Sequence, residues 1–181
     1  MSILKKLAIL ALALLFSPVL IPFAIYFARE KKWFVATVLA PLPAADKASQ
    51  ADFLLKSDEA DIQNNLATCL AQLDEAGYCL GFRIDWRDVD EVVAQGNALA
   101  GSHGIATPFS PATPDEDATV WQQLVHYDVW LQAHGFSVVL WDQGSDEYRG
   151  FICPPARLRR FIRAGKQLGL TLVKLDHENE Q

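Results

Sequence analysis

The segment FSVVLWDQGSDEYRGFIC, residues 136–153, contains the strongest structural signal in this sequence. Its first part, Phe136 to Trp141, is a nearly continuous apolar run with β-branched residues, which is typical of a central strand. Residues 142–147 combine glycine, serine and acidic side chains, as turns do, and Tyr148 to Cys153 has the composition of a second strand. The segment therefore predicts an antiparallel β-hairpin.

The chain after the hairpin predicts one more helix and a last strand. Pro154 and Pro155 suit the first turn of a helix, and Gly169 suits its end. Residues 170–175 are again mostly apolar, and residues 177–181 form a polar tail. Because a strand, a helix and a strand follow one another here, we expect the two strands of this unit to be parallel and the crossover to be right-handed.

Three helices and one strand are predicted before the hairpin. Apolar side chains at helical spacing, with Ser57 before them and Gly77 after them, predict the first helix. Residues 78–86 alternate between apolar and more polar side chains, which indicates a strand. Two capping patterns then predict helix starts, one at Asp88 and one in the segment Thr113-Pro-Asp-Glu116.

The order of these elements predicts an α+β domain over residues 53–176. We expect a small mixed sheet of about four strands, because the hairpin is antiparallel and the last unit is parallel. We also expect the helices to pack on one face of this sheet.

An apolar segment precedes this domain. Residues 7–28, LAILALALLFSPVLIPFAIYFA, contain no charge. A helix rises about 1.5 Å per residue, so a run of this length can span a hydrocarbon core of about 30 Å. We therefore expect a single-pass membrane anchor over residues 1–32 with basic flanks, which binds the lipid bilayer through residues 7–28. A cleaved signal peptide is the competing interpretation, although its apolar region is shorter, at about 7 to 15 residues.

Residues 33–52 are expected to form a juxtamembrane connector. Trp33 and Phe34 fit an aromatic anchor at the membrane interface, and residues 33–40 form a short strand in the alternative interpretation. Basic residues flank both ends of the apolar run, and their slight excess after it favours a cytoplasmic position of the domain.

Charge and cysteine content restrict the possible partners. The chain has a net charge of −6, yet residues 1–40 carry five basic residues and one acidic residue, which leaves 11 basic and 21 acidic residues for the rest. An acidic domain repels phosphate backbones, so we expect no nucleic-acid partner. The three cysteines, Cys69, Cys79 and Cys153, match no metal or dithiol motif and are expected to be buried hydrophobes, with a Cys69–Cys79 disulfide as the alternative.

Two stretches carry a resemblance to known sequences. GYCLGFRIDWRDVDE, residues 77–91, and VVLWDQGSDEYRGFICP, residues 138–154, resemble an uncharacterised bacterial family of domains of unknown function. The resemblance covers most of residues 50–175. It implies the limits of the domain and no activity.

Three groups of side chains are candidate sites. The first is the more polar face of the first strand and its rim, which can bind a peptide or small molecule if no helix covers it, or is only a solvated sheet face with an ion pair between Arg83 and Asp85: Arg83, Asp85, Trp86 and Tyr148. The second is a basic stretch that suits anionic lipid or an acidic partner, or is simply a solvated helix face: Arg157, Arg159, Arg160, Arg163 and Lys166. The third is an acidic turn with oxygen ligands for a cation, or only a solvated turn: Asp142, Asp146 and Glu147.

These features favour a membrane-tethered, non-catalytic interaction or sensing module with an unknown protein or small-molecule partner. His103, His126, His134 and His177 form no recognisable catalytic motif, and no phosphate-binding glycine loop is present, so we expect no cofactor. The alternative function is a small metal-dependent hydrolase or nuclease that uses Asp85 and the acidic turn.

Overall fold

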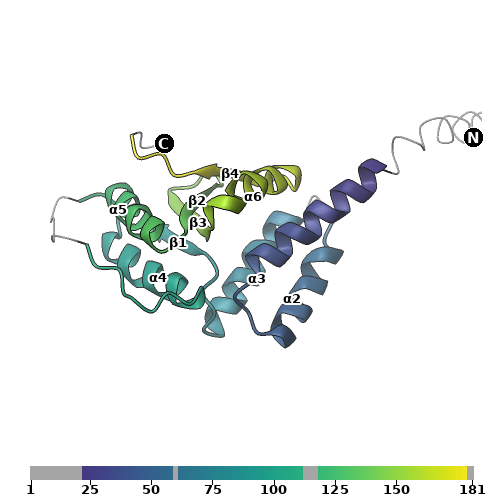
Figure 1. Ribbon diagram of the computed structural model, residues 1–181, viewed down its shortest axis with the longest axis horizontal. Helices are drawn as coiled ribbons and strands as arrows, with labels where there is room; N and C mark the ends of the chain where they lie inside the picture. The colour runs from purple at the N-terminus through teal and green to yellow at the C-terminus, as the bar shows by residue number, and fades with distance from the viewer. Residues whose placement is uncertain (1–21, 59–60, 112–117, 179–181) are drawn as a thin grey trace, which may run out of the picture.

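The structure is a computed structural model that describes residues 22–58, 61–111 and 118–178 (Figure 1). Four strands form one sheet in the order β1-β3-β2-β4. Their bounds are β1 (Phe82–Asp85), β2 (Ser137–Asp142), β3 (Glu147–Cys153) and β4 (Thr171–Lys174). Together with helices it makes the α+β fold that the sequence predicts.

The predicted hairpin is confirmed as the centre of the sheet. Strands β2 and β3 pair antiparallel, with Val139 opposite Phe151. Gly144 has a φ of 65° in the connecting turn, a backbone conformation that glycine adopts without steric cost. Nearly all of β2 is buried, as its apolar sequence predicts.

The prediction of a mixed sheet was wrong, because every neighbouring pair of strands is antiparallel. Strand β4 does run in the same direction as β3, as expected for a strand-helix-strand unit. However, β4 pairs with β2, which lies between them. The sequence predicts the direction of β4 but not the strand beside which it inserts.

The prediction that helices cover one face was also wrong, because side chains alternate across the sheet into two apolar cores. Val139, Trp141 and Phe151 belong to a core shared with α3 (Ile62–Glu75) and α6 (Pro155–Gln167). Val138, Leu140 and Ile152 belong to a second core shared with α4 (Val89–Ser102) and α5 (Val120–Ala133). The two helical groups lie on opposite sides of the sheet (Figure 1).

The start of α5 differs from the predicted one. Thr119 caps the helix, and its hydroxyl and the Gln122 side chain form a capping box. The segment 113–116, where the sequence predicts this start, lies outside the described residues.

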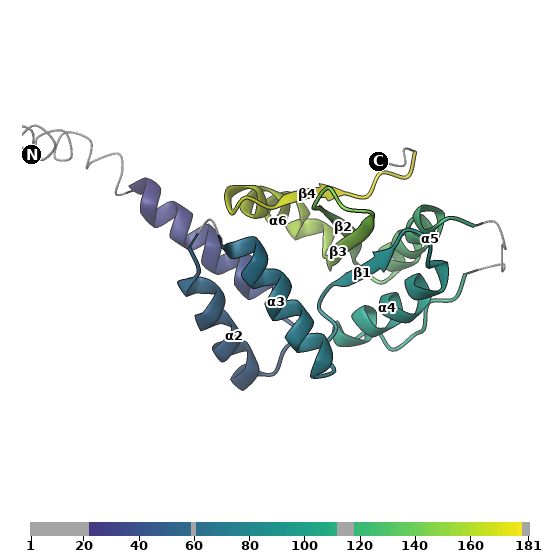
Figure 2. The same ribbon diagram turned by 180° about the vertical axis from the view of Figure 1, so that it is seen from behind.

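The structure corrects the connector that we predicted for residues 33–52. Residues 22–38 are helical, and α2 (Ala44–Lys56) follows, packed against α3 (Figure 2). Phe34, Val38 and Leu39 are buried in the first core. Their spacing is that of a helix face, so this segment belongs to the folded domain and is not the alternative short strand.

In the described part of the chain, no helix is both long and apolar enough to span a bilayer. Residues 7–21 of the predicted anchor lie outside the described residues.

Candidate functional site

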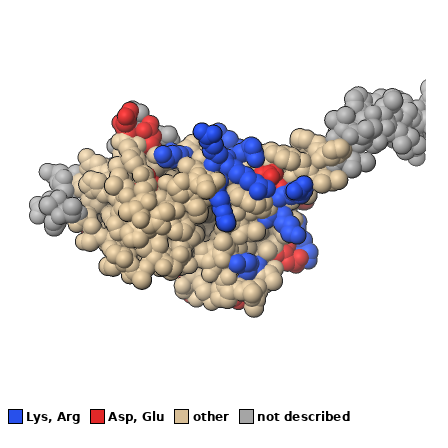
Figure 3. Space-filling model, viewed as in Figure 1, with Lys and Arg blue, Asp and Glu red and all other residues tan. Residues whose placement is uncertain are grey.

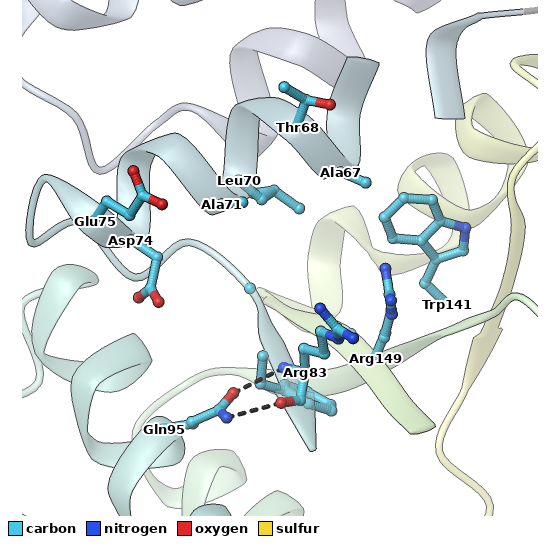
Figure 4. A pocket seen from close by; sticks show the side chains of 13 residues that line it. Ala67, Thr68, Leu70, Ala71, Asp74, Glu75, Arg83, Gln95, Trp141 and Arg149 are labelled. Carbon is cyan, nitrogen blue, oxygen red and sulfur yellow. Dashed lines mark hydrogen bonds between the residues drawn. The ribbon is translucent and has the colours of Figure 1, made fainter. Parts of the chain in front are cut away.

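A cavity of about 570 Å³ lies between α3 and the sheet near β1 (Figure 4). Its volume lies within the range of about 300–1,000 Å³ that small-molecule sites occupy. We call it the arginine pocket and define it by Arg83, Arg149, Trp141, Leu70, Asp74 and Gln95, which line it together with neighbouring residues.

The pocket exists because one face of the sheet is only partly filled by apolar side chains. Phe82 and Ile84 of β1 point into the second core, so Arg83 and Asp85 point to the opposite face. Arg83 lies directly opposite Arg149 of β3. This end of the face therefore carries guanidinium groups where the other end carries apolar side chains.

One carboxylate holds the two arginines together. The Nε and Nη2 atoms of Arg83 donate to Glu147 Oε1 at 2.9 and 2.6 Å, and Nη2 of Arg149 donates to Oε2 at 2.7 Å. These hydrogen bonds, first from Arg83 and then from Arg149, lower the pKa of Glu147 to about 2. Like charges opposite one another in a sheet repel, so Glu147 offsets part of this repulsion and leaves one net positive charge.

Strand β1 lies at the edge of the sheet and is held by α4. The Arg83 N–H donates to Gln95 Oε1 at 2.8 Å, and Gln95 Nε2 donates to the Arg83 carbonyl at 2.7 Å (Figure 4). The Gln95 amide thus satisfies both backbone groups of Arg83, as a neighbouring strand does. This pair of bonds fixes the base of the Arg83 side chain.

The remaining walls differ in character. The buried Trp141 ring and the half-buried Leu70 are apolar, and Asp74 and Glu75 of α3 carry carboxylates at one end. Figure 4 shows Arg83 and Arg149 extending from the sheet toward α3. The pocket can therefore hold a molecule with an anionic group next to an apolar body.

Only one of the four predicted sheet-face residues lines this pocket. Asp85 accepts a hydrogen bond from the Arg87 N–H at 2.9 Å, so it stabilises the turn after β1 and does not pair with Arg83. Trp86 and Tyr148 border a separate cavity of about 270 Å³. Trp86 is exposed, and its ring centroid lies 4.6 Å from the Arg87 guanidinium carbon.

Sequence reasoning missed five of the six residues that define the arginine pocket, among them Arg149, Trp141 and Gln95. Arg149 lies two positions before Phe151 in β3, so the alternation of side chains along a strand could have placed it on the pocket face of the sheet. Trp141 was assigned only to a central strand. Gln95 carries no local signal, because its role depends on how α4 packs against β1.

The acidic turn does not bring its carboxylates together. Within the described residues, no three His, Cys, Asp or Glu side chains form a group that could hold a metal ion, and Asp142, Asp146 and Glu147 are all among them. The reason is that Glu147 turns toward the arginines, while Asp142 Oδ1 accepts a hydrogen bond from the Gly144 N–H at 2.8 Å. The alternative metal-dependent function therefore has no group of ligands here.

The basic stretch lies on α6, and one of its members is structural. Arg160 donates to the buried Glu30 through Nη2 at 2.8 Å and Nε at 3.2 Å. The hydrogen bond from Arg160 lowers the pKa of Glu30 in spite of its burial. Arg157, Arg159, Arg163 and Lys166 are exposed.

The cysteines and one buried carboxylate have structural roles. All three cysteines are free and buried, as predicted, and burial raises the pKa of each thiol to about 11, so they are unreactive thiols. The fully buried Asp128 accepts from the Val138 N–H and lies 2.7 Å from His177 Nε2. This carboxylate joins α5 to β2 and to the chain after β4.

Comparison with known proteins supports the resemblance in the two quoted stretches. No curated protein and no solved structure matches the chain significantly. A family described as a domain of unknown function, DUF6630, matches residues 35–176. This range includes the end of the N-terminal helix and all the described elements from α2 to β4. The chain therefore belongs to the DUF6630 family of domains of unknown function.

Proposed function

We propose that this protein is a membrane-tethered, non-catalytic binding module whose arginine pocket takes a partner with an anionic group. The observation that carries the proposal is the pair of guanidinium groups that share one carboxylate. Each guanidinium has five N–H donors, and the bonds to Glu147 use the Nε and Nη2 atoms of each. Donors and one net positive charge therefore remain for a ligand carboxylate or phosphate.

The tether has independent support from the first turns of the N-terminal helix. Phe23 and Ile25 are 64% and 56% exposed, and residues 22–26 are exposed throughout. These turns extend beyond the folded domain (Figure 1) and continue the apolar sequence of residues 7–21. A helix that is apolar all round is stable in lipid and unfavourable in water. The basic excess after it favours a cytoplasmic domain.

The pocket is tested with phenyl phosphate and phenylacetate as probes and phenylethanol as the neutral control. Titration calorimetry on the full chain in detergent should show binding of both anions and none of the alcohol. Arg149→Gln should weaken the binding of phenyl phosphate by at least about tenfold, which is 1.4 kcal/mol. Arg87→Gln, an exposed arginine outside the pocket, is the matched control. Equal binding of the alcohol, or equal weakening by Arg87→Gln, would contradict the proposal.

The tether is tested by flotation of the expressed chain with purified membranes after washing in alkaline carbonate. A retained single span should remain with the lipid fraction, and fusion reporters after residue 181 should be active on the cytoplasmic side. Release of the full-length chain into the wash, or a mature protein that starts after Ala28, would contradict the tether.

A further inference from the structure

We propose that the C-terminal end of α6 meets the membrane surface, with Arg163 and Lys166 in contact with anionic phospholipid headgroups and Arg159 within electrostatic reach of them. We call these three residues the basic stripe. Their spacing of four and three positions puts them on one face of the helix, and all three are exposed. This inference rests on the tether in the proposed function and is independent of the arginine pocket.

The contacts of α6 show which of its ends lies toward the anchor. Trp33 and Thr37 share a surface cavity with Ala156 and Arg160, the Phe34 and Phe161 rings stack with centroids 4.8 Å apart, and Glu30 contacts Arg160 and Arg163. Positions earlier in the N-terminal helix thus face positions later in α6. The C-terminal end of α6, with Lys166, therefore lies toward the exposed apolar turns at residues 22–26.

The N-terminal helix is fixed to the domain at this contact. Glu30 is buried between Arg160 and Arg163, at 2.8 and 3.9 Å, and the Arg160 guanidinium carbon lies 4.1 Å from the Trp33 ring centroid. Phe34 packs behind them in the first core. Because the helix enters the domain without a flexible joint, the direction of the anchor determines which face of the domain meets the lipid.

The position of the stripe along the anchor matches the headgroup layer. Glu30 is two residues beyond the end of the apolar run, or about 3 Å along a helix. The headgroup layer on each side of the hydrocarbon core is about 5 to 7 Å thick. Arg163 contacts Glu30 and so lies at this depth, and Lys166 lies one turn closer to the anchor. Arg159 lies one turn farther from the anchor, about 9 Å beyond the apolar run, so it acts on the leaflet through its charge, within a Debye length of about 8 Å. Arg157 lies farther out still.

The charge of this surface complements an anionic leaflet. Residues 41–181 have nearly twice as many acidic as basic residues, yet basic side chains predominate on the face shown in Figure 3 around α6 and the N-terminal helix. Within the described residues, Arg159 and Lys166 form no ion pair. Basic side chains next to a membrane span bind anionic headgroups in this way.

Lysine acetylation measures the contact in the unmodified protein. The full chain is reconstituted in nanodiscs of phosphatidylcholine alone, or with about one third phosphatidylglycerol, and acetylation of each lysine is quantified by mass spectrometry. Lys166 should react several-fold more slowly with the anionic lipid, and 0.5 M salt should remove the difference. Lys47 on α2, which donates to the Ala40 carbonyl beyond the far end of the N-terminal helix, is the control and should be unchanged.

Two outcomes separate the inference from the tether on which it rests. If the chain is retained in nanodiscs but Lys166 reacts equally in both lipids, the proposed surface is wrong and the tether stands. If the chain does not stay with the nanodiscs, the tether and the surface are both wrong. Arg159→Glu should reduce the protection of Lys166, whereas Arg87→Glu should not, and equal effects of the two variants would also overturn the inference.

Discussion

Two glutamates in this protein each lie between two arginines, and the surroundings give the two clusters different roles. Glu30 joins the N-terminal helix to α6, and its side chain is 7% exposed. Glu147 joins β1 to β3, its side chain is 23% exposed, and the Arg83 side chain is 66% exposed. The same residue types therefore hold two helices together where apolar side chains surround them, and line the exposed arginine pocket where the sheet is left open.

The difference follows from what covers each cluster. Phe34 and Phe161 pack beside Glu30, so its charge is partly removed from water and its hydrogen bonds become strong restraints. Water reaches the arginines beside Glu147, so their attraction is weaker and their free donors remain accessible. Four predictions test this contrast.

The largest effect on stability is expected from Phe34→Ala, next to the Glu30 cluster. The variant removes a buried ring that stacks on Phe161, which typically costs about 3–5 kcal/mol of the free energy of unfolding. Urea unfolding followed by circular dichroism measures this loss. Leu70→Ala in the wall of the arginine pocket is the comparison, and it should cost less because Leu70 is only half-buried. Equal losses would show that the two regions do not differ in packing.

The second prediction compares the two glutamates directly. Glu30→Gln leaves two arginines beside a buried neutral side chain and should lower the free energy of unfolding by about 1–3 kcal/mol. Glu147→Gln removes a more exposed ion pair and should lower it by less than about 1 kcal/mol. The same urea experiment measures both variants at pH 7. A larger loss of unfolding free energy for Glu147→Gln than for Glu30→Gln would contradict the stronger structural role of Glu30.

The third prediction concerns binding in the pocket. Glu147→Gln removes the carboxylate that the two arginines share, so the net charge of the cluster rises from one to two. Phenyl phosphate should then bind about 3- to 10-fold more tightly, and phenylethanol should be unaffected. Calorimetric titration measures the change. Glu30→Gln serves as the control, and tighter binding by that variant would contradict a local effect of Glu147.

The smallest effect is a dependence of stability on pH. The pKa of Glu147 is lowered in the folded protein to about 2, so its ionised form stabilises the fold above the unfolded pKa of 4.5. This contribution is lost as the pH falls from 4.5 toward 2. The stability difference between the wild type and Glu147→Gln should therefore shrink across this range. Urea unfolding at pH 6, 4 and 3 tests it, and a difference that grows with acid would contradict the sign of the shift.

Much of the secondary structure could be predicted because its signals are local. The β2–β3 hairpin, α3, α4 and α6 all follow from periodicity, caps and turn residues near each element. Arg83 could be placed on the more polar face of its strand for the same reason. The prediction of a connector over residues 33–52 was wrong. It gave more weight to the prolines and alanines around residues 41–45 than to the helical spacing of Phe34, Val38 and Leu39.

The arginine pocket could be predicted only in part. Arg83 was found, but Arg149 and Glu147 come from the far strand of a pair whose register no local pattern contains. In the alternative interpretation Asp85 pairs with Arg83 across the strand face, whereas the carboxylate that binds Arg83 lies 64 residues away in the sequence. Cross-strand neighbours are set by pairing, and pairing depends on the turn and on both cores.

The sequence alone established an α+β domain, its central hairpin, its family resemblance and the amphipathic character of α6, since each depends on residues close together in the chain. Tertiary packing alone brought β4 beside β2, covered both faces of the sheet and buried Glu30 against an arginine 130 residues away. These features arise from contacts between distant segments, where burial and charge complementarity select one arrangement among many that local propensities allow.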